Sequence, residues 1–239
     1  MDKKVYLRYW PQLCFFALLL ASVGLSLAFL LHGVREARDS MQHGSLSTLV
    51  IDPGHGGFDG GAISDDGSKE SVINLSIAMK LKAMVEFFGE KVVLTRCDDS
   101  NRTDFASYSE HEDLVLRTAL VNQTHGAVLI SIHQNDFPTS QPSGSQVLYA
   151  ATEGSERFGK QAHQALIDVL DPENRRVAAP VPSSLYITAN VHCPAILVEC
   201  GFMSNNFEVE KLNDSGYQRR IAAALTSSYL CFIAEGDNL

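Results

Sequence analysis

The chain has 239 residues, enough for one α/β domain with a substantial core and a short additional segment. Its apolar share of 45% and charged share of 20% are typical of globular proteins and exclude a disordered chain. The formal net charge is −9, and residues 45–239 carry 14 basic against 25 acidic side chains. Because so acidic a surface repels polyphosphate, nucleic acid is excluded as a partner.

The N-terminal region has the pattern of a membrane segment. Residues 1–12 contain three basic side chains and precede the run 13–31, which only two serines and one glycine interrupt. About 20 apolar residues span a bilayer as a helix, with the basic flank inside. We therefore predict a cytoplasmic region at 1–12, a signal anchor at 13–31 and a tether at 32–47, with the remainder held outside the cytoplasm at the membrane. A cleaved signal peptide is the alternative, because Ser26-Leu27-Ala28 resembles a cleavage site, whereas a buried core helix is disfavoured because the run has no polar face.

From residue 48 onward, β-rich runs alternate with helical stretches. The predicted strands are Thr48–Asp52, Lys91–Thr95, Ala127–Ile132, Ser145–Tyr149, Leu185–Thr188 and Ala195–Glu199. The predicted helices lie near Glu70–Phe88, Glu110–Gln123, Ser155–Leu170 and Tyr217–Ala234. This alternation predicts a single α/β domain at 48–235, with a mostly parallel or mixed central sheet of about six strands and helices on both faces.

Two further expectations concern packing. Helical spacing predicts an apolar face on the first helix, formed by Leu75, Met79, Met84 and Phe87. The five cysteines, which show neither CxxC spacing nor a disulfide-like rhythm, are Cys14, Cys97, Cys193, Cys200 and Cys231. Those outside the apolar leader are predicted to be free core thiols, with a single bridge as the alternative.

Three predicted strands end in residues that can carry chemistry. His55 follows the first strand, His133 follows the strand near residue 130, and Glu199 ends the last one, while Glu70 opens the first long helix. Ligands of open α/β sheets bind beyond the carboxyl ends of the strands, so these side chains are expected on one rim. Two histidines and two glutamates have the composition of a metal site with one carboxylate to spare.

Each of these residues also has a purely structural interpretation. A lone histidine at a strand end is usually a hydrogen-bonded polar residue, Glu70 suits a helix N-terminus, and Glu199 could belong to a buried ion pair. The glycines of residues 54–61 could form only a tight turn. A nucleotide-phosphate loop is disfavoured, because its GK[ST] ending is missing. The interpretation as a metal site therefore depends on the occurrence of all four residues together.

Several motifs occur in a set order along about residues 48–235. They are Asp52-Pro53-Gly54-His55-Gly56-Gly57, Asp59-Gly60-Gly61-Ala62, Glu70, Leu94-Thr95-Arg96, Arg117, Asn122, Ser131-Ile132-His133-Gln134-Asn135, Pro194-Ala195-Ile196-Leu197-Val198-Glu199 and Gly201-Phe202-Met203-Ser204-Asn205. Together they resemble the bacterial zinc-dependent N-acetylmuramoyl-L-alanine amidases. The short anchored architecture without wall-binding repeats is similar to members of that family that trim spore cortex for germination.

The resemblance implies that His55, Glu70 and His133 bind Zn²⁺ and that Glu199 is the catalytic acid/base. The implied reaction is hydrolysis of the amide between the lactyl group of N-acetylmuramic acid and L-alanine of the peptidoglycan stem peptide. Gln134 departs from relatives, which often carry Ala there, and Cys200 is either a core filler or a stray soft ligand. The alternatives are a zinc peptidase or deacetylase acting on the same polymer, and an inactive wall-binding module of the same fold.

Some relatives block their zinc with an extra helix soon after the second histidine. Here only Asp136–Gly144 precedes the next predicted strand, and two prolines interrupt that segment. A helix of about 11 residues does not fit there. We therefore predict that the site is not plugged in cis, and that control comes from expression, substrate modification or an activating partner protein.

Overall fold

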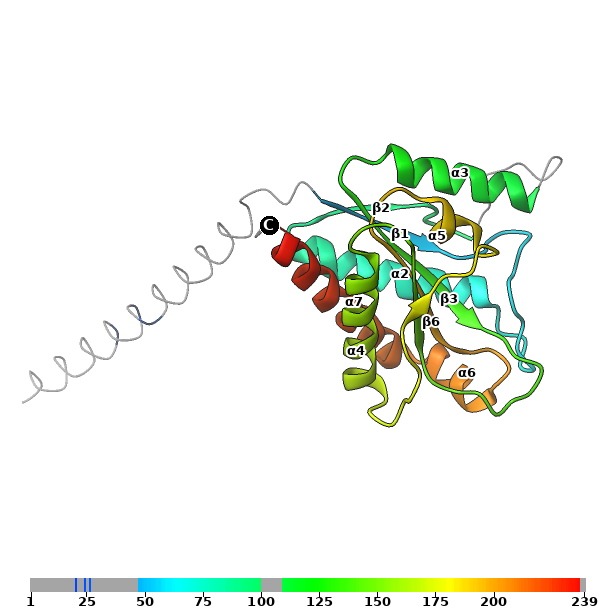
Figure 1. Ribbon diagram of the computed structural model, residues 1–239. Coiled ribbons are helices and arrows are strands. Elements are labelled where there is room, and N and C mark those ends of the chain that lie inside the picture. Colours follow the sequence, from blue (N-terminus) through cyan, green and yellow to red (C-terminus); the bar gives the residue numbers. More distant parts are fainter. Residues whose placement is uncertain (1–19, 21–23, 25, 27–46, 100–108, 237–239) are drawn as a thin grey trace, which may run out of the picture. The chain divides into compact units, whose positions relative to one another are not determined.

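The computed structural model describes residues 47–99 and 109–236, together with Leu20, Gly24 and Ser26 (Figure 1). Apart from these three residues, the predicted anchor at 13–31 lies outside the described part, and so does the predicted tether up to residue 46. Within the described residues, no helix has the length and apolar character that crossing a membrane requires.

The domain contains a mixed six-stranded sheet, as the sequence predicts. Its elements are β1 (Thr48–Pro53), α2 (Glu70–Phe87), β2 (Lys91–Leu94), α3 (Glu110–Gln123), β3 (Ala127–Asn135), β4 (Gln146–Tyr149), α4 (Ser155–Leu170), β5 (Ala179–Pro180), α5 (Tyr186–Asn190), β6 (Ala195–Phe202), α6 (Asn206–Asn213) and α7 (Ser215–Gly236). The strand order is β2-β1-β3-β6-β4-β5. The first four strands run parallel, and β4 is antiparallel to β6.

Helices cover both faces of the sheet, which confirms the predicted layers (Figure 1). In β1, Leu49 and Ile51 belong to a core shared with α2, α4 and α7, whereas Val50 belongs to a second core with α3 and α5. A strand that is buried on both faces needs apolar residues at consecutive positions, which explains the apolar runs in β1 and β3. The carboxyl ends of β1, β3 and β6 therefore emerge together from a rigid, doubly covered sheet.

One predicted strand is wrong. The segment Leu185–Thr188 is not extended, because it forms the beginning of the short helix α5, after a turn in which Leu185 N–H donates to the Pro182 carbonyl oxygen. Its β-branched residues favour a strand, but the edge position beside β4 is taken by β5. The helix instead buries Ile187 and Thr188.

Helix α6 is not among the predicted helices. Its first backbone N–H groups are capped by the Asn205 side chain, which accepts from Phe207 and Glu208. An asparagine followed three residues later by glutamate is a helix-start signal. The sequence therefore contains a start signal for α6, but the helix has only 8 residues, too few for a clear helical periodicity.

The predicted apolar face of α2 is wrong for Met79 and Phe87, although Met84 is partly buried and packs against the core. Met79 and Phe87 are 42% and 84% exposed, and the buried apolar residues are Ile73, Ile77, Leu81 and Val85. Apolar residues lie on several sides of this helix, so spacing alone does not identify the buried side. Ile73, Ile77, Leu81 and Val85 lie 3, 7, 11 and 15 residues after the buried Glu70, so they follow it along one face.

The prediction of free thiols is confirmed for Cys97, Cys193, Cys200 and Cys231. The prediction that they fill the core holds for Cys200, which is buried, but is wrong for Cys97 and Cys231, which are exposed. Cys97 follows β2 in a bend, and Cys231 lies on the outer side of α7. Cys200 packs in the core between the sheet and α2, α4 and α7, which favours its interpretation as a core filler.

Candidate metal centre and catalytic carboxylate

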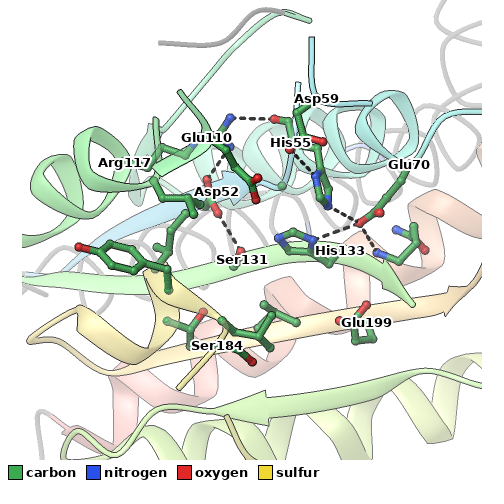
Figure 2. A pocket seen from close by; sticks show the side chains of 18 of the residues that line it. Asp52, His55, Asp59, Glu70, Glu110, Arg117, Ser131, His133, Ser184 and Glu199 are labelled. Carbon is green, nitrogen blue, oxygen red and sulfur yellow. Dashed lines mark hydrogen bonds and ion pairs between the residues drawn. The ribbon is translucent and has the colours of Figure 1, made fainter. Parts of the chain in front are cut away.

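The four predicted site residues lie together at the carboxyl edge of the sheet. His55 follows β1 by two residues, Glu70 begins α2, His133 lies near the end of β3, and Glu199 belongs to β6. All four line one cavity of about 290 Å³ (Figure 2). The expectation that these side chains share one rim is therefore confirmed, and their roles remain to be assigned.

Three of these side chains converge on one point. Glu70 Oε1 lies 3.1 Å from His133 Nδ1 and 3.3 Å from His55 Nε2. Ligating atoms of all three residues lie within 4.8 Å of one another. Two imidazole nitrogens and a carboxylate oxygen are a typical donor set of a catalytic zinc ion, with a further position left for water. The residues present thus fit such an ion.

Backbone donors fix the Glu70 carboxylate. Oε1 accepts from Gln134 N–H at 3.0 Å, and Oε2 accepts from Ala62 N–H at 3.0 Å. Burial opposes ionisation of Glu70, but His133 and His55 hold its pKa well below the usual range. Glu70 is therefore an ionised carboxylate whose position is fixed by backbone hydrogen bonds, as a candidate ligand requires.

The Gln134 side chain supports the Glu70 carboxylate through Asn74. Its side-chain Nε2 donates at 3.0 Å to Asn74 Oδ1, and Asn74 in turn donates to Glu70 Oε1 at 3.3 Å. Side chains of neighbouring strand residues point to opposite faces, so the Gln134 side chain lies on the α2 side and not beside the His133 imidazole. The Gln134 side chain therefore acts on the candidate ligand Glu70 through Asn74, and not by contacting the His133 imidazole.

Asp59 orients the His55 imidazole. Its Oδ2 lies 2.7 Å from His55 Nδ1, on the ring side away from Glu70. Burial lowers the pKa of His55, but Asp59 and Glu70 outweigh this and raise it to about 10. The carboxylates thus favour a positive charge at this position, either a proton on His55 or a metal ion. Asp59 has no role among the predictions from sequence, although an acid four residues after a candidate ligand is a usable signal.

Glu199 lies beside His133 on the neighbouring strand. The two residues are paired in the β3–β6 register, and His133 lies between His55 and Glu199 in Figure 2. Glu199 Oε2 is buried without a hydrogen-bond partner among the described residues. Burial raises the pKa of Glu199 to about 7, although His133 opposes the shift. A carboxyl group with a pKa near neutrality can both accept and return a proton.

Two buried arginines hold the loop that carries His55. Arg117 donates to the His55 carbonyl oxygen at 2.7 Å and to the buried Asp52 carboxylate at 3.1 Å. Arg96 donates to the Gly54 carbonyl oxygen at 3.0 Å. His55 has φ +61°, a conformation that non-glycine residues rarely adopt, so these bonds offset backbone strain. The two arginines occur in the motifs quoted above, but nothing in their spacing indicated this role.

Two glycines make room for the ligands. A Cβ atom on Gly54 would lie 2.1 Å from His133 Cε1, and one on Gly61 would lie 2.6 Å from Glu70 Oε2. Both distances are far below van der Waals contact. The residue type at these positions is therefore set by the neighbouring His133 and Glu70 side chains, and at Gly61 also by its φ of +66°.

A family model described as N-acetylmuramoyl-L-alanine amidase matches residues 49–229. The chain belongs to this family. It is a cell-wall amidase, an enzyme that hydrolyses peptidoglycan. The family resemblance that the motifs indicate is confirmed.

The amidase is similar to proteins of known type over most of its domain. The germination-specific N-acetylmuramoyl-L-alanine amidase of Bacillus subtilis is 32% identical over 197 residues, which are 79% of this chain and 81% of that protein. A structure of the CwlD amidase from Clostridioides difficile in complex with the GerS lipoprotein has a TM-score of 0.74 at 32% identity, covering 79% of this chain and 98% of that chain. A second amidase structure, from Clostridium difficile 630, has a TM-score of 0.69 at 28% identity, covering 80% and 98%.

The segment after the second histidine of this amidase contains no helix. Residues 136–145 connect β3 to β4 through bends and extended chain, which confirms the prediction that a plugging helix does not fit. The segment is tied to the α6 region, because Gly144 N–H donates to Glu208 Oε2 at 2.9 Å and Phe137 N–H to Ser204 Oγ at 3.1 Å. How the amidase is regulated stays a prediction.

Proposed function

We propose that the domain cleaves the amide between the lactyl group of N-acetylmuramic acid and L-alanine of the stem peptide, with a zinc ion held by His55, Glu70 and His133. One observation carries the proposal. The three ligating groups converge within 4.8 Å beside Glu199, whose buried oxygen has no partner among the residues that the structure describes. A metal-ligand set next to a carboxyl group of raised pKa is the equipment of a metal-assisted hydrolase.

The residues of the chain then have distinct tasks. A zinc ion at this position supplies Lewis acidity, which polarises a carbonyl and lowers the pKa of a water molecule to about 7. Glu199 Oε2 accepts the proton of the attacking water and returns it to the departing alanine nitrogen. Asp59 keeps the proton of His55 on Nδ1, which leaves the Nε2 lone pair free for the ion.

We further propose that the domain works outside the cytoplasm, attached to the membrane through residues 13–31. The apolar run with its basic flank supports this placement, and the location of peptidoglycan agrees with it. Similarity to the germination-specific amidase supports a role in spore cortex. The CwlD structure, which contains a lipoprotein, supports an activating partner protein.

The test combines metal counting with analysis of products. The purified protein should contain about one zinc ion per chain and release from peptidoglycan an intact stem peptide with a free alanine amino end, as measured by mass spectrometry. A chelator should abolish release, and added zinc should restore it. Peptides cut internally, or deacetylated sugars, would favour the peptidase or deacetylase. A zinc-loaded protein that releases nothing, even with a lipoprotein partner added, would favour the binding module.

Replacing Asp59 with Asn should weaken zinc binding about 10- to 100-fold, because the His55 imidazole loses the carboxylate that orients it. Competition with a chromophoric chelator measures the change in affinity. Asp65→Asn is the matched control, since Asp65 is exposed in the same loop region and accepts a long hydrogen bond from Asn206, at 3.4 Å. Equal zinc affinity in both variants would show that Asp59 does not support the metal site.

A further inference from the structure

The C-terminal end of α2 carries an exposed apolar surface. Ala83, Met84, Phe87 and Phe88 of this region, with Lys80 and Arg219, line a shallow hollow of about 360 Å³. Phe87 is 84% exposed and Phe88 is 44% exposed. Their rings meet edge to face, with 5.6 Å between the ring centroids. We call this surface the Phe87–Phe88 patch. Adjacent exposed aromatic residues of this kind usually mark a contact site.

The two charged residues that line the Phe87–Phe88 patch, Lys80 and Arg219, are both cationic. Nearby along the chain, Lys82 and Glu86 form an ion pair, and Glu90 and Lys91 carry opposite charges, so these four residues add no net charge. The body of the chain is strongly acidic, with 14 basic against 25 acidic residues after position 44. The patch therefore combines adjacent aromatic side chains with a local positive charge that contrasts with the acidic chain, and it fits an apolar partner with anionic groups around it.

The patch also lies where the chain enters the domain. Phe88 leads through Gly89 and Glu90 into β2, and Lys91 pairs with Thr48, the first residue of β1. The predicted tether ends at residue 47, directly before this pair. The candidate metal centre follows the other end of β1, six residues and about 20 Å away along the strand. The patch and the cavity thus lie at opposite edges of the sheet.

We propose that the Phe87–Phe88 patch is a membrane contact, in which the aromatic side chains enter the interface of a bilayer that contains anionic lipid. Aromatic side chains favour that interface, and lysine and arginine beside them are attracted to anionic headgroups. The contact holds the sheet so that its carboxyl edge, with the cavity, faces away from the bilayer. This inference depends on the proposed extracytoplasmic attachment, but not on the proposed bond specificity.

The experiment uses the full chain in vesicles and a fluorescent reporter. Trp10 is the only tryptophan, so Trp10→Phe provides a silent background for Phe87→Trp. In vesicles of phosphatidylglycerol and phosphatidylcholine (3:7) with brominated acyl chains, emission of the Phe87→Trp reporter should fall at least about twofold relative to unbrominated lipid. The control reporter, Phe207→Trp, should keep its emission, because Phe207 is 80% exposed but lies in the first turn of α6, beyond the carboxyl end of β6.

The outcomes separate the proposals. Equal quenching of the two reporters would overturn the membrane contact, and so would failure of the full chain to float with vesicles. Protection of the Phe87→Trp reporter by a soluble protein alone would overturn it in favour of a protein partner. Quenching that is as strong in pure phosphatidylcholine would exclude the anionic-lipid component. Peptide release by the same vesicles is measured in parallel, so quenching without release counts against the proposed reaction and not against the membrane contact.

Discussion

Replacing Glu199 with Gln should lower kcat for stem-peptide release by roughly 10²- to 10⁴-fold while one zinc ion stays bound. The amide has nearly the same shape as the carboxyl group but cannot accept the proton of water. Glu199 is not one of the three candidate ligating groups, so its replacement should leave them in place. Mass spectrometry of released peptides and metal analysis of the same sample measure the two quantities.

The control for this change is Glu210→Gln, which makes the same substitution at an exposed position on α6. Its activity and zinc content should match those of the unchanged protein. Activity above about a tenth of the original in Glu199→Gln would contradict the assignment of Glu199 as the proton-transferring group. Loss of zinc in that variant would instead show that Glu199 helps to hold the ion.

Replacing Gly54 with Ala should remove most of the bound zinc and lower activity by about 10²-fold or more. The added Cβ would lie 2.1 Å from His133 Cε1 and 2.2 Å from His133 Nε2, so the imidazole must move. Because the moving group is itself a predicted ligand, a single methyl group should disrupt the metal centre. Metal analysis and peptide release are the measurements, with circular dichroism to establish that the variant is folded.

The control is Gly60→Ala, in the same glycine-rich loop. A Cβ atom at Gly60 would meet Cδ and Cγ of the Lys69 side chain at ordinary contact distances of 3.7 and 4.0 Å. Neither glycine has a positive φ, so the two substitutions differ in what the methyl group meets and not in backbone strain. If Gly54→Ala retains zinc and activity as well as Gly60→Ala does, His133 is not held where the structure places it.

The close approach of the four candidate site residues could be predicted, because each of them is marked by the residues next to it in the sequence. His55, His133 and Glu199 each follow or end a run of apolar strand residues, and parallel strands bring their carboxyl ends to one edge. Glu70 follows the glycine-rich loop and opens a helix, which places it at the same edge. The order of the motifs added a resemblance to one family, and the family match confirmed it.

Other features depend on contacts between distant parts of the chain. Leu185–Thr188 has the composition of a strand, but the place beside β4 is occupied by β5, and the segment becomes helical. The buried side of α2 is set by Glu70, which must reach His133 on another element. The roles of Arg96 and Arg117 exist only once β1, β2 and α3 are assembled. Arg96 reaches a carbonyl group 42 residues away along the chain, and Arg117 reaches one 62 residues away. No pattern in the neighbouring residues encodes such contacts.

The pairing of His133 with Glu199 has a consequence for how such an enzyme can diversify. The spacing between these two residues is set by the ladder between β3 and β6, at about 4.8 Å per strand, and not by the length of the chain that joins them. Insertions or deletions in residues 136–145 or around α5 can therefore reshape the walls of the cavity without altering the distance between His133 and Glu199. Recognition and chemistry can change independently in this fold.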